Sequence, residues 1–328
     1  MKPLIVFLVF LLTGLTACRQ VPEGGAPLTI HASSASTLTP AVPPASFSPV
    51  PAASTSTFSP SSNLTPGTAT PDIYSTPTLG LDAWMFMPVV PAFSDTARAI
   101  YKRGLIMGRD PHRFSKAGDC ESTTGWYLSD FDRTPPTYSL GEYEYLKTTI
   151  DYYAGSFGRE SLAVRRGANT ASLLTTLWAD PQQCQDGESM LACEIRNHNP
   201  SILIIAVGSN DVVGVDNFEI QMRRIIEFTI SEGVLPILST KADNVEGGHK
   251  LNIIIGNLAY EYDIPLWNFW LAVQPLPDHG LDPDGSHLTF GSNNFDDPER
   301  MQKAWPWRNL TALQTLDAAR QALESATP

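Results

Sequence analysis

The apolar positions in the second half of the chain predict strands that alternate with helices. Residues 201–207 read Ser-Ile-Leu-Ile-Ile-Ala-Val, a continuous β-branched run that ends at Gly208, as expected of a strand buried on both faces of a parallel sheet. Residues 234–238 repeat this pattern. Between the two runs, the residues at helical spacing are Phe218, Met222, Ile225, Ile226 and Thr229. The segment therefore predicts a strand–helix–strand unit with a right-handed crossover.

Further elements extend this alternation in both directions. Apolar spacing predicts helices over residues 96–105, 251–260 and 310–323, and short strands over residues 112–116 and 264–267. Elements that alternate in this way favour an α/β fold, a three-layer α/β/α sandwich with a central parallel sheet. In such folds ligands bind at the carboxyl ends of the strands.

The first seventeen residues have the pattern of an export signal. Lys2 supplies a positive charge, and residues 4–12 form an apolar stretch that is too short to span a bilayer. Residues 15–18, Leu-Thr-Ala-Cys, resemble a lipobox, after which a bacterial signal peptidase cleaves once the cysteine is lipidated. We therefore expect a signal peptide over residues 1–17, a mature N-terminus at Cys18, and a protein anchored by lipid to the bacterial cell membrane and facing outside the cytoplasm. The alternative is an ordinary secretory signal with an incidental cysteine.

Residues 18–79 are rich in serine, threonine, proline and alanine. No Asp, Glu, Lys or Arg occurs between Glu23 and Asp72, and such a segment cannot bury a core. As a tether, it would reach roughly 40 Å by random-coil scaling. Residues 80–328 are then long enough for one substantial domain. The formal net charge of the chain is −12, which argues against a nucleic-acid partner because a negative surface repels phosphates.

The four cysteines of an exported chain each need an assignment. Cys18 is assigned to lipid. Cys184 and Cys193 flank a polar segment, at a spacing that a tight loop can close, so we expect a disulfide between them. Two reduced thiols, or a pairing of Cys120 with one of these two, are the alternatives. Cys120 would otherwise be a lone thiol that is either buried and inert or kept for chemistry.

Four short motifs follow predicted strands or lie in turn-rich loops. They are Gly118-Asp119-Cys120, Gly167, residues 208–211 (Gly-Ser-Asn-Asp) and residues 284–287 (Asp-Gly-Ser-His). Each motif alone is ordinary turn or helix-cap chemistry.

Together, and in this order, the motifs resemble the SGNH (GDSL) hydrolase family over residues 112–325. The four blocks of that family are a Gly-Asp-Ser nucleophile turn, a lone glycine, Gly-x-Asn-Asp, and Asp-x-x-His near the C-terminus. The resemblance implies a flavodoxin-like topology and hydrolysis of acyl esters. It assigns His287 as general base and Asp284 as the residue that orients it. It also implies an oxyanion hole made by the backbone N–H groups of Cys120 and Gly167 and by the side-chain amide of Asn210.

The sequence departs from the family at the nucleophile, where Cys120 replaces serine. A free thiol has a pKa of about 8.5 that falls near a helix N-terminus or a histidine, so a Cys-His-Asp triad is competent for acyl transfer. Ser122 is a fallback nucleophile, but we expect it to point away from the site.

No metal or cofactor is expected. His279, Asp282, Asp284 and His287 crowd one loop, but their spacing matches neither a helical zinc pair nor a calcium loop. The predicted function is thus hydrolysis of acyl esters, of glycans or of small molecules. The rival interpretation is a binding module that keeps the fold and has lost turnover with the serine. A redox role for the thiol is a third.

Overall fold

The structure, a computed structural model, describes residues 79–324. The predicted signal peptide, residues 18–78 of the predicted tether and the predicted lipidation site at Cys18 lie outside the described residues and stay predictions. Among the described helices, none combines the length and the apolar character that a membrane span requires.

The core of the fold is a sheet of four parallel strands. The order in the sheet is β1, β2, β3, β4. The strands β2 and β3 are buried along their whole length, as their continuous apolar runs predict. Strand β4 has only two residues. The strands span Asp110–Gly118 (β1), Pro200–Ala206 (β2), Leu235–Ser239 (β3) and Leu266–Trp267 (β4).

A fifth, degenerate strand lies at the other edge of β1. Gly118 forms an isolated parallel bridge with Val164. The N–H of Gly118 donates to the carbonyl of Ala163 at 3.0 Å, and the N–H of Arg165 donates to the carbonyl of Gly118 at 3.2 Å. If this bridge is counted as a strand and the strands are numbered along the chain, their order across the sheet is 2-1-3-4-5, the flavodoxin-like order. The order reverses between β1 and β2, and ligands bind in such folds at that switch point.

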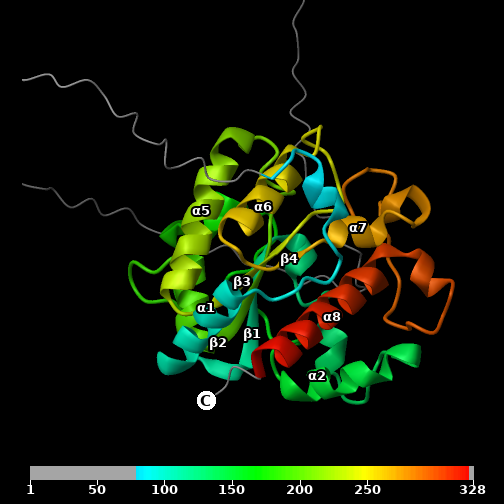
Figure 1. The fold of residues 1–328 in the computed structure, drawn as a ribbon, viewed down its shortest axis with the longest axis horizontal. Coiled ribbons are helices and arrows are strands. Elements are labelled where there is room, and N and C mark those ends of the chain that lie inside the picture. The colour runs from blue at the N-terminus through cyan, green and yellow to red at the C-terminus, as the bar shows by residue number, and fades with distance from the viewer. Residues whose placement is uncertain (1–78, 325–328) are drawn as a thin grey trace, which may run out of the picture. The chain divides into compact units, whose positions relative to one another are not determined.

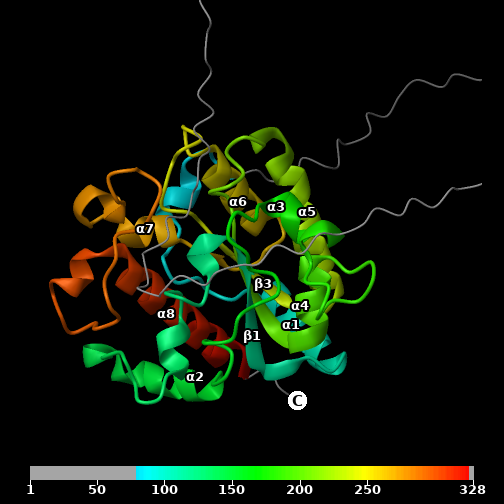
Figure 2. The ribbon, with the colours of Figure 1, turned by 180° about the vertical axis from the view of Figure 1, so that it is seen from behind.

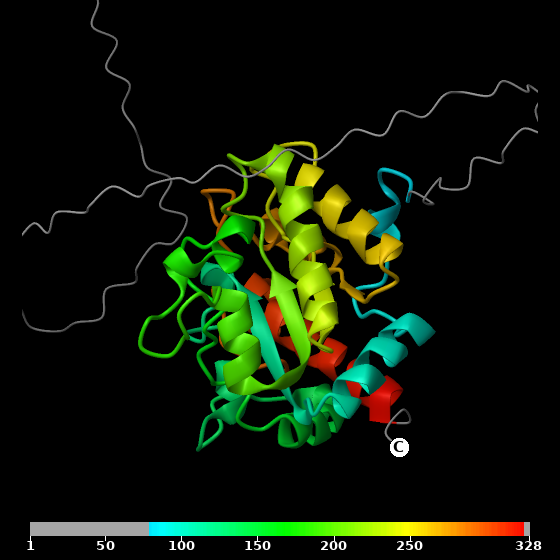
Figure 3. The same ribbon diagram turned by 90° about the vertical axis from the view of Figure 1, so that its left-hand side faces the viewer.

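Helices cover both faces of the sheet. Helices α1, α2 and α8 form one layer, and α3, α4, α5 and α6 form the other (Figures 1 and 3). The view from behind shows α4 beside β1 and α3 next to α5 (Figure 2). The helices span Asp95–Ile106 (α1), Lys147–Tyr152 (α2), Thr170–Leu173 (α3), Met190–His198 (α4), Val215–Ser231 (α5), Lys250–Glu261 (α6), Phe269–Val273 (α7) and Ala304–Glu324 (α8).

Most of the predicted elements are confirmed. Helix α5 buries Phe218, Met222, Ile225, Ile226 and Thr229, the five positions that predicted it. The helices expected over residues 96–105, 251–260 and 310–323 are α1, α6 and α8, and the strand expected over residues 112–116 is β1. Helices α2, α3, α4 and α7 were not predicted. The three-layer α/β/α architecture with a parallel sheet is confirmed.

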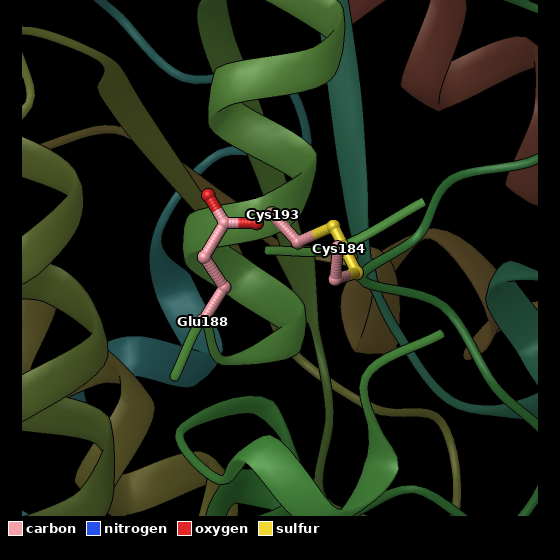
Figure 4. A group of neighbouring side chains, drawn as sticks. All are labelled: Cys184, Glu188 and Cys193. Atoms are coloured by element: carbon pink, nitrogen blue, oxygen red, sulfur yellow. A yellow bond between two sulfur atoms is a disulfide. The ribbon is translucent and has the colours of Figure 1, made fainter. Parts of the chain in front are cut away.

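The expected disulfide between Cys184 and Cys193 is present. The two Cα atoms lie 5.2 Å apart, and the bond ties the start of α4 to the loop before it (Figure 4). The Glu188 carboxylate lies near both sulfur atoms. Metal binding requires thiolates, which the disulfide removes, and Glu188 accepts hydrogen bonds from the guanidinium of Arg196 at 2.5 and 2.7 Å. We therefore assign this cluster a structural role.

Candidate active site

The turn after β1 is packed too tightly for any residue but glycine at position 118. A Cβ on Gly118 would lie 2.2 Å from Oγ of Ser122 and 2.5 Å from the carbonyl oxygen of Ala206. The chain then enters a short 3₁₀ helix, Cys120–Ser122, whose cap is the buried Asp119: its Oδ1 accepts a hydrogen bond from the N–H of Glu121 at 3.1 Å. The turn therefore presents Cys120 at the carboxyl end of β1.

Ser122 lies beneath this turn. It is buried, and its Oγ is 3.5 Å from the carbonyl oxygen of Ala206 on β2. The hydroxyl therefore faces the sheet, as expected, and Ser122 is not in a position to replace Cys120 as a nucleophile.

Cys120 itself is half-buried, and its sulfur is in a disulfide bond in this structure. Cys184 and Cys193 pair with each other, and Cys18 lies outside the described residues. The expectation of a lone thiol at position 120 is therefore corrected. Because a disulfide sulfur carries no thiolate, nucleophilic attack by Cys120 requires that this bond be reduced first. Its assignment as the nucleophile stays a prediction.

The second and third motifs meet beside this turn. Gly167 follows the degenerate strand with φ +79°, a left-handed conformation that favours glycine. The side-chain Nδ2 of Asn210 donates to the carbonyl of Ala168 at 3.0 Å. Asp211 accepts hydrogen bonds from the N–H and the hydroxyl of Thr170 at 3.1 and 2.6 Å, which fixes the start of α3. The two segments that the resemblance assigns to the oxyanion hole are thus joined directly.

Asn210 does not cap a helix. Helix α5 begins at Val215 with Gly214 at its cap position, so Asn210 lies in the loop between β2 and α5. The alternative explanation of this asparagine, an ordinary helix cap, is therefore wrong.

The fourth motif forms an acid–histidine pair. Oδ2 of Asp284 lies 2.6 Å from Nδ1 of His287, and Oδ1 accepts the backbone N–H groups of Ser286 and His287, each at 3.0 Å. Partial burial raises the pKa of Asp284, but these backbone and ring hydrogen bonds outweigh it and lower that pKa to about 2. The carboxylate is thus ionised at neutral pH and can hold an imidazolium.

Aromatic contacts hold the histidine loop against the segment that follows Cys120. The ring of Trp126 lies 5.6 Å from that of Phe290 and 5.7 Å from that of Trp305. The N–H of Trp305, in the first turn of α8, also donates to the carbonyl of Thr289 at 3.2 Å. Since Phe290 follows His287 by three residues, these contacts bring the first and fourth motifs to the same end of the sheet.

A buried charged cluster lies beneath the site and was not predicted from the sequence. A cavity of about 10 Å³ is lined by Asp119, Glu121, Ser209, Lys241 and Arg308, among others. Its volume is comparable to that of one water molecule. The guanidinium of Arg308 stacks on the rings of Tyr127, Trp267 and Phe269, and its Nε donates to the carbonyl of Glu121 at 3.1 Å. No sequence pattern marks the cluster, because its members come from four separate segments of the chain.

The carboxyl groups of this cluster hold protons more tightly than usual. Burial raises the pKa of Glu121 to about 8, although the nearby Arg308 lowers it in part. Burial likewise raises the pKa of Asp119 to about 6, against the hydrogen bond from the N–H of Glu121. Glu121 is therefore largely protonated at neutral pH, and the turn that carries Cys120 rests on a neutral carboxyl group.

Comparisons with known proteins returned only structural matches. No family model and no curated protein matches the sequence. One solved structure that it resembles is a GDSL-like lipase from Bacteroides thetaiotaomicron, with 18% identity over 70% of this chain and 100% of that chain and a TM-score of 0.37. Another is a catalytic mutant of an acetylxylan esterase from Geobacillus stearothermophilus, with 12% identity over 64% of this chain and 93% of that chain and a TM-score of 0.39. These scores are low, and the fold is established by the strand order and register of the sheet itself.

Proposed function

We propose that this chain is a lipid-anchored hydrolase of acyl esters that acts outside the cytoplasm. The observation that carries the proposal is the Asp284–His287 pair, with Oδ2 2.6 Å from Nδ1, on a loop that packs against the segment after Cys120. The site lies where the strand order of the sheet reverses, which is where α/β folds bind ligands.

In the proposed mechanism the working form is the one in which Cys120 carries a free thiol. His287 takes the proton of the thiol, and the sulfur attacks the ester carbonyl carbon. The negative oxygen that forms is held by the backbone N–H groups of Cys120 and Gly167 and the amide of Asn210. The C–O bond breaks, and the alcohol leaves with the proton from His287.

The second half of the reaction regenerates the thiol. A water molecule gives a proton to His287 and adds to the thioester carbonyl, the C–S bond breaks, and the carboxylic acid leaves. The proton returns to the sulfur. Asp284 stabilises the imidazolium in both halves, and the mechanism needs no cofactor.

Hydrolysis of p-nitrophenyl acetate by the full chain in detergent tests the proposal. The protein is treated with dithiothreitol, freed of it by gel filtration, and compared with the untreated protein. We expect turnover in the reduced protein, and its loss in Cys120→Ala and His287→Ala. The matched control is His279→Ala, which removes an exposed histidine of the same region whose Nδ1 contacts the carbonyl of Gln274.

Reduction also opens the Cys184–Cys193 disulfide, so that effect needs its own control. The double variant Cys184→Ala, Cys193→Ala lacks this bond before treatment. It should be as active as the wild type after reduction if Cys120 is the nucleophile. Reduced wild-type protein without turnover would overturn the proposal.

A second function, binding of an ester or glycan without turnover, is favoured by the disulfide at Cys120. The variant Cys120→Ser tests it, because serine needs no reduction. A wild type that stays inert after reduction, together with a gain of activity in Cys120→Ser, would support a binding module on a hydrolase scaffold. Incorporation of radiolabelled palmitate that is lost in Cys18→Ala tests the lipid anchor.

A further inference from the structure

The segment after β3 buries an ion pair beside the loop of Asn210. Lys241 is 4% exposed, and its Nζ lies 2.5 Å from Oδ1 of Asp243 and 2.6 Å from Oε2 of Glu246. Burying such charges costs free energy that their attraction does not always recover. A gain in stability is therefore a weak explanation for burying these charged residues. Their contacts with the loop that carries Asn210 point to another role.

Lys241 and Asp243 contact the two residues that precede Asn210, which are Gly208 and Ser209. Oδ2 of Asp243 accepts a hydrogen bond from the hydroxyl of Ser209 at 3.0 Å. The side chain of Lys241 runs under Gly208, where a Cβ would lie 3.0 Å from its Cδ. Gly208 has φ +135°, so the lysine stem supports a backbone conformation that favours glycine.

Lys241 is in turn fixed to helix α6. Its N–H donates to Oδ1 of Asn252, and Nδ2 of Asn252 donates to its carbonyl, each at 2.9 Å. A continuous series of contacts therefore leads from α6 through the ion pair and Ser209 to Asn210. On its far side, Asn210 is held by its hydrogen bond to Ala168.

We propose that Lys241 and Asp243 are positioning residues that, through Ser209, aim the side-chain amide of Asn210 into the oxyanion hole. The inference rests on the hydrolase function proposed above. One Nδ2 hydrogen of Asn210 is taken by Ala168, and the other is the donor to the negative oxygen. Because a donor acts only when it is aimed before the reaction, a small rotation of this amide lowers the rate without weakening substrate binding.

Ser209→Ala in the full, reduced chain is the direct test. Losing one oxyanion donor lowers kcat by about 10² to 10³-fold, so a misaimed donor should lower it by roughly 10-fold or more, with KM unchanged. Ser209→Thr keeps the hydroxyl and should restore most of the rate. The matched control is Ser231→Ala, which removes a hydroxyl that bonds only within the end of α5. Loss of rate equal to that control would overturn the proposal.

A second measurement does not depend on turnover. The side-chain amide of Asn210, assigned by NMR through loss of its signals in Asn210→Ala, should shift in Ser209→Ala and in Asp243→Asn and stay unchanged in Ser231→Ala. If the wild type proves inactive but these signals shift, the hydrolase function fails and the positioning role stands. If they do not shift, the positioning role is wrong whatever the activity. Should Asp243→Asn fail to fold, Ser209→Ala decides alone.

Discussion

The two halves of the proposed active site are stabilised in different ways. Asp284 and His287 lie three residues apart on a half-exposed loop, and the hydrogen bonds that shape the pair come from within the motif. The turn that carries Cys120 is supported from remote parts of the chain. Gly118 packs on Ala206, and Arg308 bonds the carbonyl of Glu121 across 187 positions. The histidine loop is therefore shaped by contacts within its own sequence. The turn depends on contacts that form only when the whole domain folds.

The largest effect should come from the local half. His287→Ala removes the only base that the proposed mechanism uses, so we expect kcat of the reduced protein to fall by about 10⁴-fold. The midpoint of urea unfolding should hardly move, because the ring is on a half-exposed loop. Stopped-flow or steady-state ester hydrolysis and an unfolding curve check both statements. A large shift of the urea-unfolding midpoint would mean that His287 also supports the fold, and the two halves of the site would then not differ in this respect.

The opposite result is expected in the turn. A Cβ at position 118 overlaps Ser122 and Ala206, so Gly118→Ala should lower the free energy of unfolding by about 3 kcal/mol. Gly125→Ala is the control, because no atom lies within 4 Å of a Cβ there and its φ suits other residues. Chemical denaturation measures both variants. Equal effects would show that the turn after β1 is not tightly packed.

The same contrast explains what the sequence could predict. Strands β2 and β3 and helix α5 were predictable because periodicity is a local signal. The Asp284–His287 pair and the Cys184–Cys193 disulfide follow from short spacings. The degenerate strand at Val164 was not predictable, since one bridge leaves no periodic pattern. The supports of the turn were not predictable either.

Those supports consist of polar residues that meet only in the folded chain. Arg308 lies in helix α8 among polar and apolar residues alike, and Glu121 and Ser122 look like ordinary turn residues. Lys241 looks like a solvated lysine after a strand. The parts of the site that the sequence does not predict are thus those that depend on long-range contacts between buried polar groups.

The protonation of Glu121 should make the stability of the protein fall as the pH rises from about 5 to about 8. Its pKa is raised to about 8 in the folded state, so above the unfolded value the folded chain binds more protons than the unfolded chain. Stability from this group is then present below the unfolded pKa and is lost as the pH rises through the folded pKa. The slope is at most on the order of 1 kcal/mol per pH unit. Glu121→Gln should flatten the pH dependence of urea midpoints between about pH 5 and pH 8. An unchanged slope contradicts this assignment.

The smallest effect on stability is expected for Asp284→Asn. The pKa of Asp284 is lowered to about 2, so any stability that it contributes is present above the unfolded value and is lost only as the pH falls toward 2. Its side chain is 49% exposed, and solvent screening keeps that contribution small. We therefore expect nearly equal urea midpoints for the variant and the wild type, and the small difference should not change between neutral pH and about pH 4, because the carboxylate stays ionised throughout.

Activity should nevertheless fall in Asp284→Asn, since an amide neither fixes the ring tautomer nor stabilises the imidazolium. The two measurements together separate function from folding at one residue. A variant that loses stability and keeps its activity would mean that the Asp284–His287 pair holds the loop together and does not act on substrate. A variant that keeps its stability and loses its activity places this carboxylate in the chemistry of the site, and leaves the turn of Gly118 as the part that the fold must hold in place.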